Sequence, residues 1–491
     1  MPVSLADILA LLPEILLSLG ALLLMMTEVF LAGARRGYQA LLAALFTAAA
    51  FAAFLAQRGG GPRVLFGGFA VSDGFALFAG ATICAGLLVT VVLGAGFLAP
   101  RSAERGEFYA LALLAAAGMC LLVRAEDLLF VFIALELMSV PTYALVAYLR
   151  TGDRPSEAAF KYFLLGAFSS ALFLYGAALV FGATGRTSLS GIAAAGGGKL
   201  LLAGLALVIA GLSFKIAAVP FHMWAPDVYE GASTPVTAFM AVGVKAASFA
   251  VLTRILVTAF GAPALAAVWQ PLVVALALLT MVFGNLLALT QRNVKRMLAY
   301  SSVAHAGYLL VAVAAASRGF SGPSARGEAV SSLLFYLAAY TLTTAGAFGA
   351  LAALERMGPD PQPWDLDRFA GLAKRRPWAA AATAMLMLSL AGIPPTVGFI
   401  GKLLVFKAAV DAGLVPLAIA GVLASVVGLY YYLRVVVVMY MQPAPLGSVP
   451  TPASWPLDLV LVATATLVLL FGLAPAGLAN AALSSTGLLG G

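Results

Sequence analysis

Four ionisable side chains lie deep inside long apolar stretches of this chain: Glu136, Lys215, Lys245 and Lys402. Glu136 stands in the run VFIALELMSVPTYALVAYL, about nine residues from either polar end, and a carboxylate at such a depth costs at least ~2.5–3.5 kcal/mol on membrane-insertion scales. Each residue alone could be a structural ion pair or a snorkelling lysine. Together they favour a water-filled or ion-conducting path, because intramembrane charges usually line one.

Two histidines add titratable groups to this set. His305 lies about eight residues into its own apolar segment, at 1.5 Å per residue a depth similar to that of the lysines. His222 lies between Pro220 and Pro226, and it has either a structural hydrogen bond or a proton-uptake role.

The chemistry that these residue types predict is proton transfer. Burial disfavours the charged form of a lysine, and a nearby carboxylate favours it. A carboxylate that moves by a few ångströms would therefore load or unload the proton of the lysine. We expect Glu136 beside Lys215 to be such a switch, with Lys245, His305 and Lys402 as relay stations joined by ordered water.

The elements that position these groups are membrane-spanning helices. Hydrophobic residues make up 63% of the 491 residues and charged residues 10%, far from the composition of a soluble domain. Apolar windows of about 20 residues predict an all-α polytopic protein, a single integral-membrane domain over 1–491, with about fourteen spans. The approximate limits are 9–32, 38–57, 75–99, 108–123, 127–149, 157–183, 200–229, 235–260, 268–289, 297–317, 329–354, 377–411, 415–440 and 457–479.

Prolines interrupt the seventh and the twelfth of these spans. Proline lacks an N–H and clashes with the carbonyl four residues earlier, so Pro220 frees the Ile216 carbonyl, and Pro394–Pro395 free two carbonyls just before Lys402. Paired interrupted segments in corresponding positions are typical of inverted-repeat transporters. The spacing of five spans predicts that spans four to eight (108–260) repeat as spans nine to thirteen (268–440).

The distribution of charge between the loops predicts the orientation. If the N-terminus lies outside, the cytoplasmic loops carry fourteen Lys and Arg residues and the outer loops seven. Positive loops stay on the cytoplasmic side, so both termini should lie on the outer face. The net charge of +8 reflects this bias and requires no nucleic-acid partner.

Motifs for cofactors and metals are absent from the sequence. Cys84 and Cys120 are isolated within spans, without the paired spacing of a metal or Fe–S site. The stretch GGGK at 196–199 resembles a phosphate-binding loop, but Leu200 follows where Ser or Thr is required. We therefore expect no cofactor and no metal in this chain, and we expect no β-strands.

Three blocks of sequence carry a family resemblance. The stretches SFKIAAVPFHMWAPDVYEGASTPVTAFMAVGVKAASF (213–249), NVKRMLAYSSVAHAGYLL (293–310) and GIPPTVGFIGKLLVF (392–406) resemble the antiporter-like subunits of respiratory NADH:quinone oxidoreductase, which share a superfamily with the Mrp-type antiporters. The resemblance covers nearly the whole chain in order and spacing. The family includes a branch that has no long lateral helix. Two features favour this branch: the stretch 225–239, and Lys402 at a position where another subunit carries glutamate.

The resemblance implies roles for individual residues. Glu136 matches the fifth-helix glutamate of the family, Lys215 the lysine of its broken helix, and Lys245 and Lys402 the lysines of the eighth and twelfth helices. His305 matches a histidine often found on the central axis. The family also implies a bacterial inner-membrane location, other membrane-arm subunits as partners, and NADH, FMN, Fe–S clusters and quinone bound by partner subunits rather than by this chain.

Three functions remain open on these grounds. The first is a proton-translocating subunit of the respiratory enzyme, whose redox chemistry takes place elsewhere in the complex. The second is a subunit of a stand-alone cation/proton antiporter with the same fold and charges. The third is a scaffold subunit that transports nothing.

Overall fold

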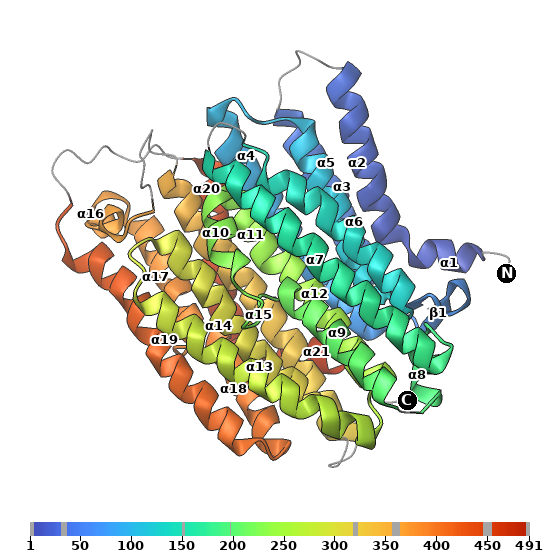
Figure 1. Cartoon of the computed structure of the whole chain (residues 1–491). Helices are drawn as coiled ribbons and strands as arrows, with labels where there is room; N and C mark the ends of the chain where they lie inside the picture. Colours follow the sequence, from blue (N-terminus) through green and yellow to red (C-terminus); the bar gives the residue numbers. More distant parts are fainter. Residues whose placement is uncertain are drawn as a thin grey trace.

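The computed structural model describes residues 4–30, 37–149, 153–196, 198–317, 323–355, 364–444 and 454–487. Within them nearly all regular structure is helical (Figure 1). The helices are α1 (Leu5–Ala10), α2 (Leu12–Phe30), α3 (Gly37–Gln57), α4 (Gly74–Leu98), α5 (Gly106–Arg124), α6 (Leu128–Val146), α7 (Asp153–Thr184), α8 (Leu189–Ala194), α9 (Lys199–Lys215), α10 (Trp224–Gly231), α11 (Thr234–Phe239), α12 (Lys245–Arg254), α13 (Pro263–Leu289), α14 (Val294–Ala316), α15 (Pro323–Glu355), α16 (Leu372–Arg375), α17 (Pro377–Ala391), α18 (Val397–Asp411), α19 (Val415–Met441), α20 (Trp455–Leu473) and α21 (Ala476–Leu483).

Twelve helical segments of the described residues are long and apolar enough to cross a membrane. Most agree with the predicted spans to within a few residues. The exceptions are the two interrupted spans, whose pieces are each shorter than a full crossing. A polytopic membrane protein made mostly of helices is therefore confirmed.

Three of the long helices begin directly after a residue whose side chain caps the first turn. Asp73 precedes α4 and accepts a hydrogen bond from the Ala76 N–H, and Asp127 does the same for α6 through the Leu129 N–H. Asn293 caps α14 through the Arg296 N–H. Such caps satisfy N–H groups that the first turn leaves without partners, so polar residues at the ends define where the apolar helices begin.

Both predicted interruptions are present. α9 ends at Lys215, and residues 216–223 separate it from the eight-residue α10. α17 ends at Ala391, where Gly392 has a φ of +84°, and α18 begins at Val397. Pro141, by contrast, lies inside α6 without ending it.

The expectation of no strands was wrong. The short strands β1 (Arg63–Leu65) and β2 (Ala70–Ser72) form an antiparallel hairpin, with Arg63 opposite Ser72. The hairpin lies between α3 and α4 and is too short to give an alternating apolar signal. Short 3₁₀ segments, which we also did not predict, are η1 (Phe66–Gly68), η2 (Ala99–Arg101) and η6 (Leu366–Phe369).

The eighth span is also less regular than predicted. It contains α11, the π-helical segment η3 (Met240–Val244), α12 and a second π-helical segment η4 (Ile255–Ala259). Single-turn π segments are frequent at functional sites. Here one of them ends immediately before Lys245.

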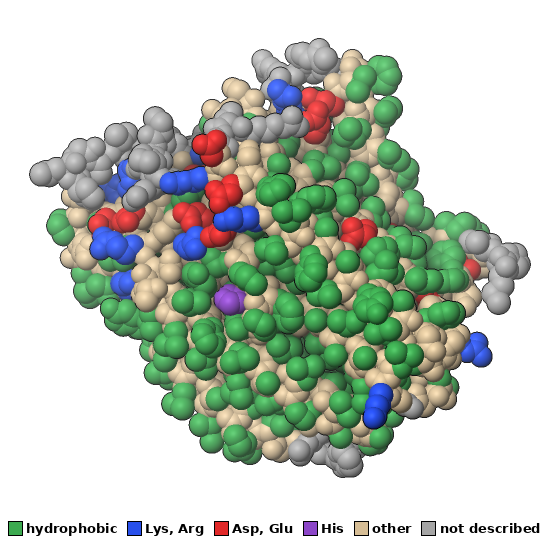
Figure 2. Space-filling model, in the orientation of Figure 1, with side chains coloured by type: hydrophobic (Ala, Val, Ile, Leu, Met, Phe, Trp, Pro, Cys, Tyr) green, Lys and Arg blue, Asp and Glu red, His purple; other side chains and the backbone are tan. Residues whose placement is uncertain are grey.

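The centre of the molecule is formed by the eighth span, α14 and α15, which are the most buried of the crossing segments. α15 packs against α4, α14, α18 and α20, and α13 packs along α14. The helices α2, α3, α7, α13 and α19 expose apolar side chains, as lipid-facing helices do. In Figure 2 green side chains cover the middle of the molecule, and red and blue ones gather at the end near α10 and α16.

Candidate functional site

The first buried lysine, Lys215, is the last residue of α9 and faces α6. Its Nζ donates hydrogen bonds to Ser139 Oγ at 2.8 Å and to the Tyr143 hydroxyl at 3.1 Å. Glu136 lies on the same helix one turn before Ser139, and its Oε1 accepts a hydrogen bond from Ser170 Oγ of α7. One face of α6 therefore presents both the carboxylate and the two hydroxyls that hold the lysine.

The predicted pair of Glu136 and Lys215 is not a direct ion pair in this conformation. No contact within 4.0 Å joins the two charged groups, although Glu136 acts electrostatically on Lys215. The lysine donates instead to Ser139, one turn after Glu136 on the same helix. The switch that we predicted would need a second state in which the carboxylate replaces the hydroxyls, and it stays a prediction.

The second lysine, Lys245, is the first residue of α12 and is bound by α14. Its Nζ donates to both the carbonyl and the Oγ of Ser302, and the Tyr340 hydroxyl of α15 donates to the same Oγ at 2.8 Å. His305 lies one turn further along α14, and its ring is 5.2 Å from that of Tyr340. The structure thus brings Lys245 and His305 to one polar cluster.

His305 is held at both ring nitrogens by tyrosines. Nδ1 is 2.7 Å from the Tyr336 hydroxyl of α15, and Nε2 is 3.2 Å from the Tyr432 hydroxyl of α19. Ser301 also hydrogen bonds to Tyr432. A phenol can donate or accept, so both tautomers of the imidazole can be accommodated and a proton can leave on either side.

The third lysine, Lys402, occupies the interruption between α17 and α18. Its three N–H groups reach the carbonyls of Leu390 at 2.9 Å and Ala391 at 3.0 Å and the Oγ of Ser425 at 2.8 Å. These are the two carbonyls that Pro394 and Pro395 were predicted to free, and that expectation is confirmed. The Tyr308 ring lies 5.0 Å from Lys402 Nζ and 5.5 Å from the His305 ring, so the lysine and the histidine share one neighbour.

Gly392 makes room for the Lys402 side chain. A Cβ atom at this position would lie 2.9 Å from Lys402 Cδ and 3.2 Å from Nζ, and the φ of +84° is one that side-chain-bearing residues rarely adopt. The predicted polar gap in the twelfth span is therefore built around the amine.

His222 lies apart from these clusters. It follows the cis Val219–Pro220 bond in the interruption of the seventh span, is half-buried, and its buried Nδ1 has no hydrogen-bond partner within the described part of the chain. No hydrogen bond between described residues connects it with the lysines, so its role stays between the two alternatives given above.

Sequence reasoning missed the hydroxyl groups that hold the lysines. A usable signal was present, because SVPTY at 139–143 and SVAHAGY at 302–308 are weakly similar stretches in the two halves. Their first residues, Ser139 and Ser302, bind Lys215 and Lys245 in the same way.

A buried arginine, Arg254, pairs with carboxylates at the end of α12. Arg254, at the end of α12, pairs with the buried Asp73 at 2.9 Å and contacts Glu126 at 3.6 Å. Glu126 lies in the loop after α5, and burial raises the pKa of its carboxyl group. Arg254 therefore ties the end of α12 to Asp73, the residue that caps α4.

Comparisons with known proteins give the class. Residues 125–428 match the family described as NADH:quinone oxidoreductase/Mrp antiporter, TM, and the chain belongs to this family. NADH-quinone oxidoreductase subunit N of Myxococcus xanthus is 49% identical over 96% of each chain, and subunit N 1 of Sorangium cellulosum is 47% identical over 94% of this chain and 95% of its own. The branch favoured by residues 225–239 and Lys402 is thus that of subunit N, and the resemblance is confirmed.

Solved structures agree with this assignment. A chain of respiratory complex I from Thermus thermophilus is 36% identical, covers 96% of this chain and 100% of its own length, and has a TM-score of 0.82. A chain of the Mrp complex from Dietzia has a TM-score of 0.84 at 24% identity over 99% of this chain and 98% of its own, which indicates a shared fold alone.

Proposed function

We propose that this chain translocates protons across the bacterial inner membrane as an antiporter-like subunit of NADH:quinone oxidoreductase. Its partners are other membrane-arm subunits. NADH, FMN, Fe–S clusters and quinone belong to partner subunits, and the chain itself performs no redox step.

One observation carries the proposal. Lys245, His305 and Lys402 lie in one series of neighbouring groups. Ser302 joins Lys245 to Tyr340, whose ring is 5.2 Å from that of His305, and the Tyr308 ring is 5.5 Å from the His305 ring and 5.0 Å from Lys402 Nζ. Every group in this series can donate or accept a proton or a hydrogen bond, and the series crosses the most buried part of the molecule. Such a series serves no purpose in a scaffold, whose core apolar residues would fill at lower cost.

The path divides into two related halves. Each half contains one interrupted crossing: α9 with α10 in the first, and α17 with α18 in the second. Together with the twelve uninterrupted segments these two crossings give fourteen. Residues 108–260 and 268–440 are then inverted repeats, and each contains one of the two interrupted crossings in the corresponding position. Both termini lie on the outer face.

The experiment uses the chain in its native membrane. Affinity purification should recover NADH-oxidising subunits, and inverted vesicles should take up protons, reported by a ΔpH dye, during NADH oxidation. Substituting Lys215 by alanine should lower this uptake without lowering the amount of assembled enzyme. Full uptake in that variant would favour the scaffold function.

The second candidate is a subunit of a stand-alone cation/proton antiporter, supported by the shared fold with the Dietzia Mrp chain. Purification would then recover small antiporter subunits and no flavin. Neighbouring genes separate the two candidates in the same way.

A further inference from the structure

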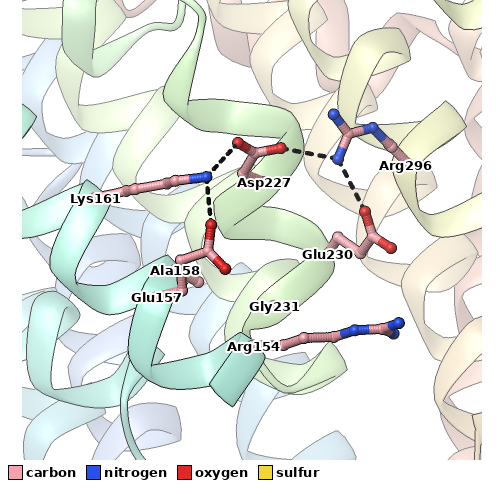
Figure 3. Close-up of a pocket in the computed structure, with 8 residues that line it drawn as sticks. All are labelled: Arg154, Glu157, Ala158, Lys161, Asp227, Glu230, Gly231 and Arg296. Atoms are coloured by element: carbon pink, nitrogen blue, oxygen red, sulfur yellow. Dashed lines mark hydrogen bonds and ion pairs between the residues drawn. The ribbon is translucent and has the colours of Figure 1, made fainter. Parts of the chain in front are cut away.

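A charged pocket lies against α10, the second half of the interrupted seventh span (Figure 3). It has a volume of about 170 Å³ and is formed by residues of α7, α10 and the start of α14. Its side chains alternate in charge: Glu157 and Lys161 from α7, Asp227 and Glu230 from α10, and Arg296 from α14.

Ion pairs in this pocket join α10 to α7 on one side and to α14 on the other. Lys161 Nζ is 3.0 Å from Asp227 Oδ2 and 2.7 Å from Glu157 Oε1. Arg296 Nη1 is 2.8 Å from Asp227 Oδ1 and 2.9 Å from Glu230 Oε2. Asp227 is therefore the point at which one carboxylate holds α10 to both flanking helices.

The inner face of α10 is connected to the buried Lys215 through aromatic side chains. Trp224 stacks on Tyr162 of α7 with ring centroids 4.7 Å apart, and Tyr162 in turn contacts Tyr143, which binds Lys215. α10 also packs against α14, the helix whose Ser302 binds Lys245. Trp224 and Tyr229 of α10 are buried and, with Tyr162, form an aromatic layer on the inner side of this helix.

α10 is poorly fixed by its own backbone. Eight residues are too few for a helix that is stable by itself, and no side chain caps its N-terminus. Residues 216–223 before it form no regular helix and permit movement relative to α9. Lys295 donates to the carbonyls of Glu230 and Ala232 and so holds the far end. The ion pairs at Asp227 add polar contacts to the packing of Trp224 on Tyr162.

We propose that the ion pairs of the charged pocket form an electrostatic latch on α10, and that α10 is the gate that separates solvent in the pocket from Lys215 and Lys245. With the latch closed, the layer of Tyr162, Trp224 and Tyr229 blocks the path. With the pairs at Asp227 broken, α10 moves about the interruption and water from the pocket reaches the lysines. This inference rests on the proposed proton-translocating function and adds its point of control.

The test substitutes Asp227 by asparagine, which keeps the shape of the side chain and removes its charge. The assembled complex in inverted vesicles is given a ΔpH without NADH, and its decay is recorded by a dye. Two half-exposed ion pairs are lost, so we expect the proton leak to rise about fivefold, equivalent to about 1 kcal/mol in favour of the open gate. Hydrogen–deuterium exchange of the backbone amides at 224–231 should accelerate by a similar factor.

The chain offers a matched control at the opposite end of the bundle. Lys407 pairs with Asp411 four residues later and with Glu328, as Lys161 does with Glu157 and Asp227. Glu328→Gln should change neither the leak nor the exchange at 224–231. Asp227→Glu keeps the charge and should restore both values toward those of the wild type.

The outcomes separate the latch from the proposed function. An assembled Asp227→Asn complex with wild-type leak and wild-type exchange would overturn the latch alone, provided that the wild type pumps. If the wild type does not pump, the proposed function fails first. If Asp227→Asn does not assemble, Lys161→Gln removes only one of the two pairs at Asp227, and an unchanged exchange rate in that variant also overturns the latch.

Discussion

Replacing Lys402 by alanine is the most direct test of the relay. The side chain supplies three hydrogen bonds, to the carbonyls of Leu390 and Ala391 and to Ser425, in a space that Gly392 keeps open. Alanine removes this titratable group and leaves the Leu390 carbonyl without the lysine donor, whereas Ser425 Oγ still lies 3.5 Å from the Ala391 oxygen.

The magnitude follows from two opposing effects. Hydrogen bonds to a charged group contribute about 1.5–3 kcal/mol each, but desolvating an ammonium group costs several kcal/mol, so the net change in stability is small and the complex should assemble. A positioned proton-transfer group contributes about 10²- to 10⁴-fold to a rate. Water can enter the vacated polar space and replace part of this, so we expect coupled proton uptake to fall about tenfold or more.

The assay measures dye-reported proton uptake by inverted vesicles during NADH oxidation, normalised to assembled enzyme. Lys402→Arg should not rescue uptake, because guanidinium stays protonated and cannot pass a proton on. Lys402→Glu should retain activity, since the family places glutamate at this position in another subunit. Lys407→Ala is the control, an exposed lysine of the same helix five residues later, and it should pump normally. Uptake in Lys402→Ala equal to that control would refute the reasoning.

The remaining predictions concern other parts of the path. Glu136→Gln or Lys215→Ala should reduce pumping more than loss of the exposed Lys407, because each removes one of two opposite charges that lie within the spans; equal effects would contradict the pairing. Tyr432→Phe removes one of two hydroxyls on His305 and should slow pumping several-fold, whereas the double change with Tyr336→Phe should nearly abolish it; additive small effects would show that neither hydroxyl relays protons. A reporter protein that is active only outside the cytoplasm, fused after the last residue, should give a signal. A signal from a reporter that works only in the cytoplasm would reverse the proposed orientation.

The sequence predicted the crossings and the interruptions because both depend on strong local signals. Twenty apolar residues have few alternatives to a transmembrane helix, and Pro220 and Pro394 remove hydrogen bonds that a continuous helix needs. Even the acceptors of Lys402 could be named in advance, because a proline identifies the carbonyl that it frees. Pro141 shows the limit of this rule, since α6 continues past it.

The partners of the other lysines could not be predicted in this way. Lys215 and Lys245 are bound by hydroxyls from helices distant in the sequence, and a serine in an apolar helix more often bonds its own backbone, as Ser139 also does with the Leu135 carbonyl. Nothing local distinguishes Ser302 from Ser248, which bonds only the carbonyl of Val244. Tertiary packing decides which hydroxyl faces an amine, so only the structure reveals the relay.

The three lysine sites differ in a way that bears on direction. Lys215 is held by two hydroxyls, which can rotate, accept and donate, and Lys245 by one hydroxyl and one carbonyl of Ser302. Lys402 is held by two carbonyls, which can only accept, and by the hydroxyl of Ser425. A site made of fixed acceptors favours the protonated amine, and it loses that preference only if α17 or α18 moves. We therefore propose that proton release from Lys402 requires the second interruption to change shape. On this proposal the two interrupted spans have complementary tasks: α10 controls access to the first two lysines, and the gap at Gly392 controls departure from the third.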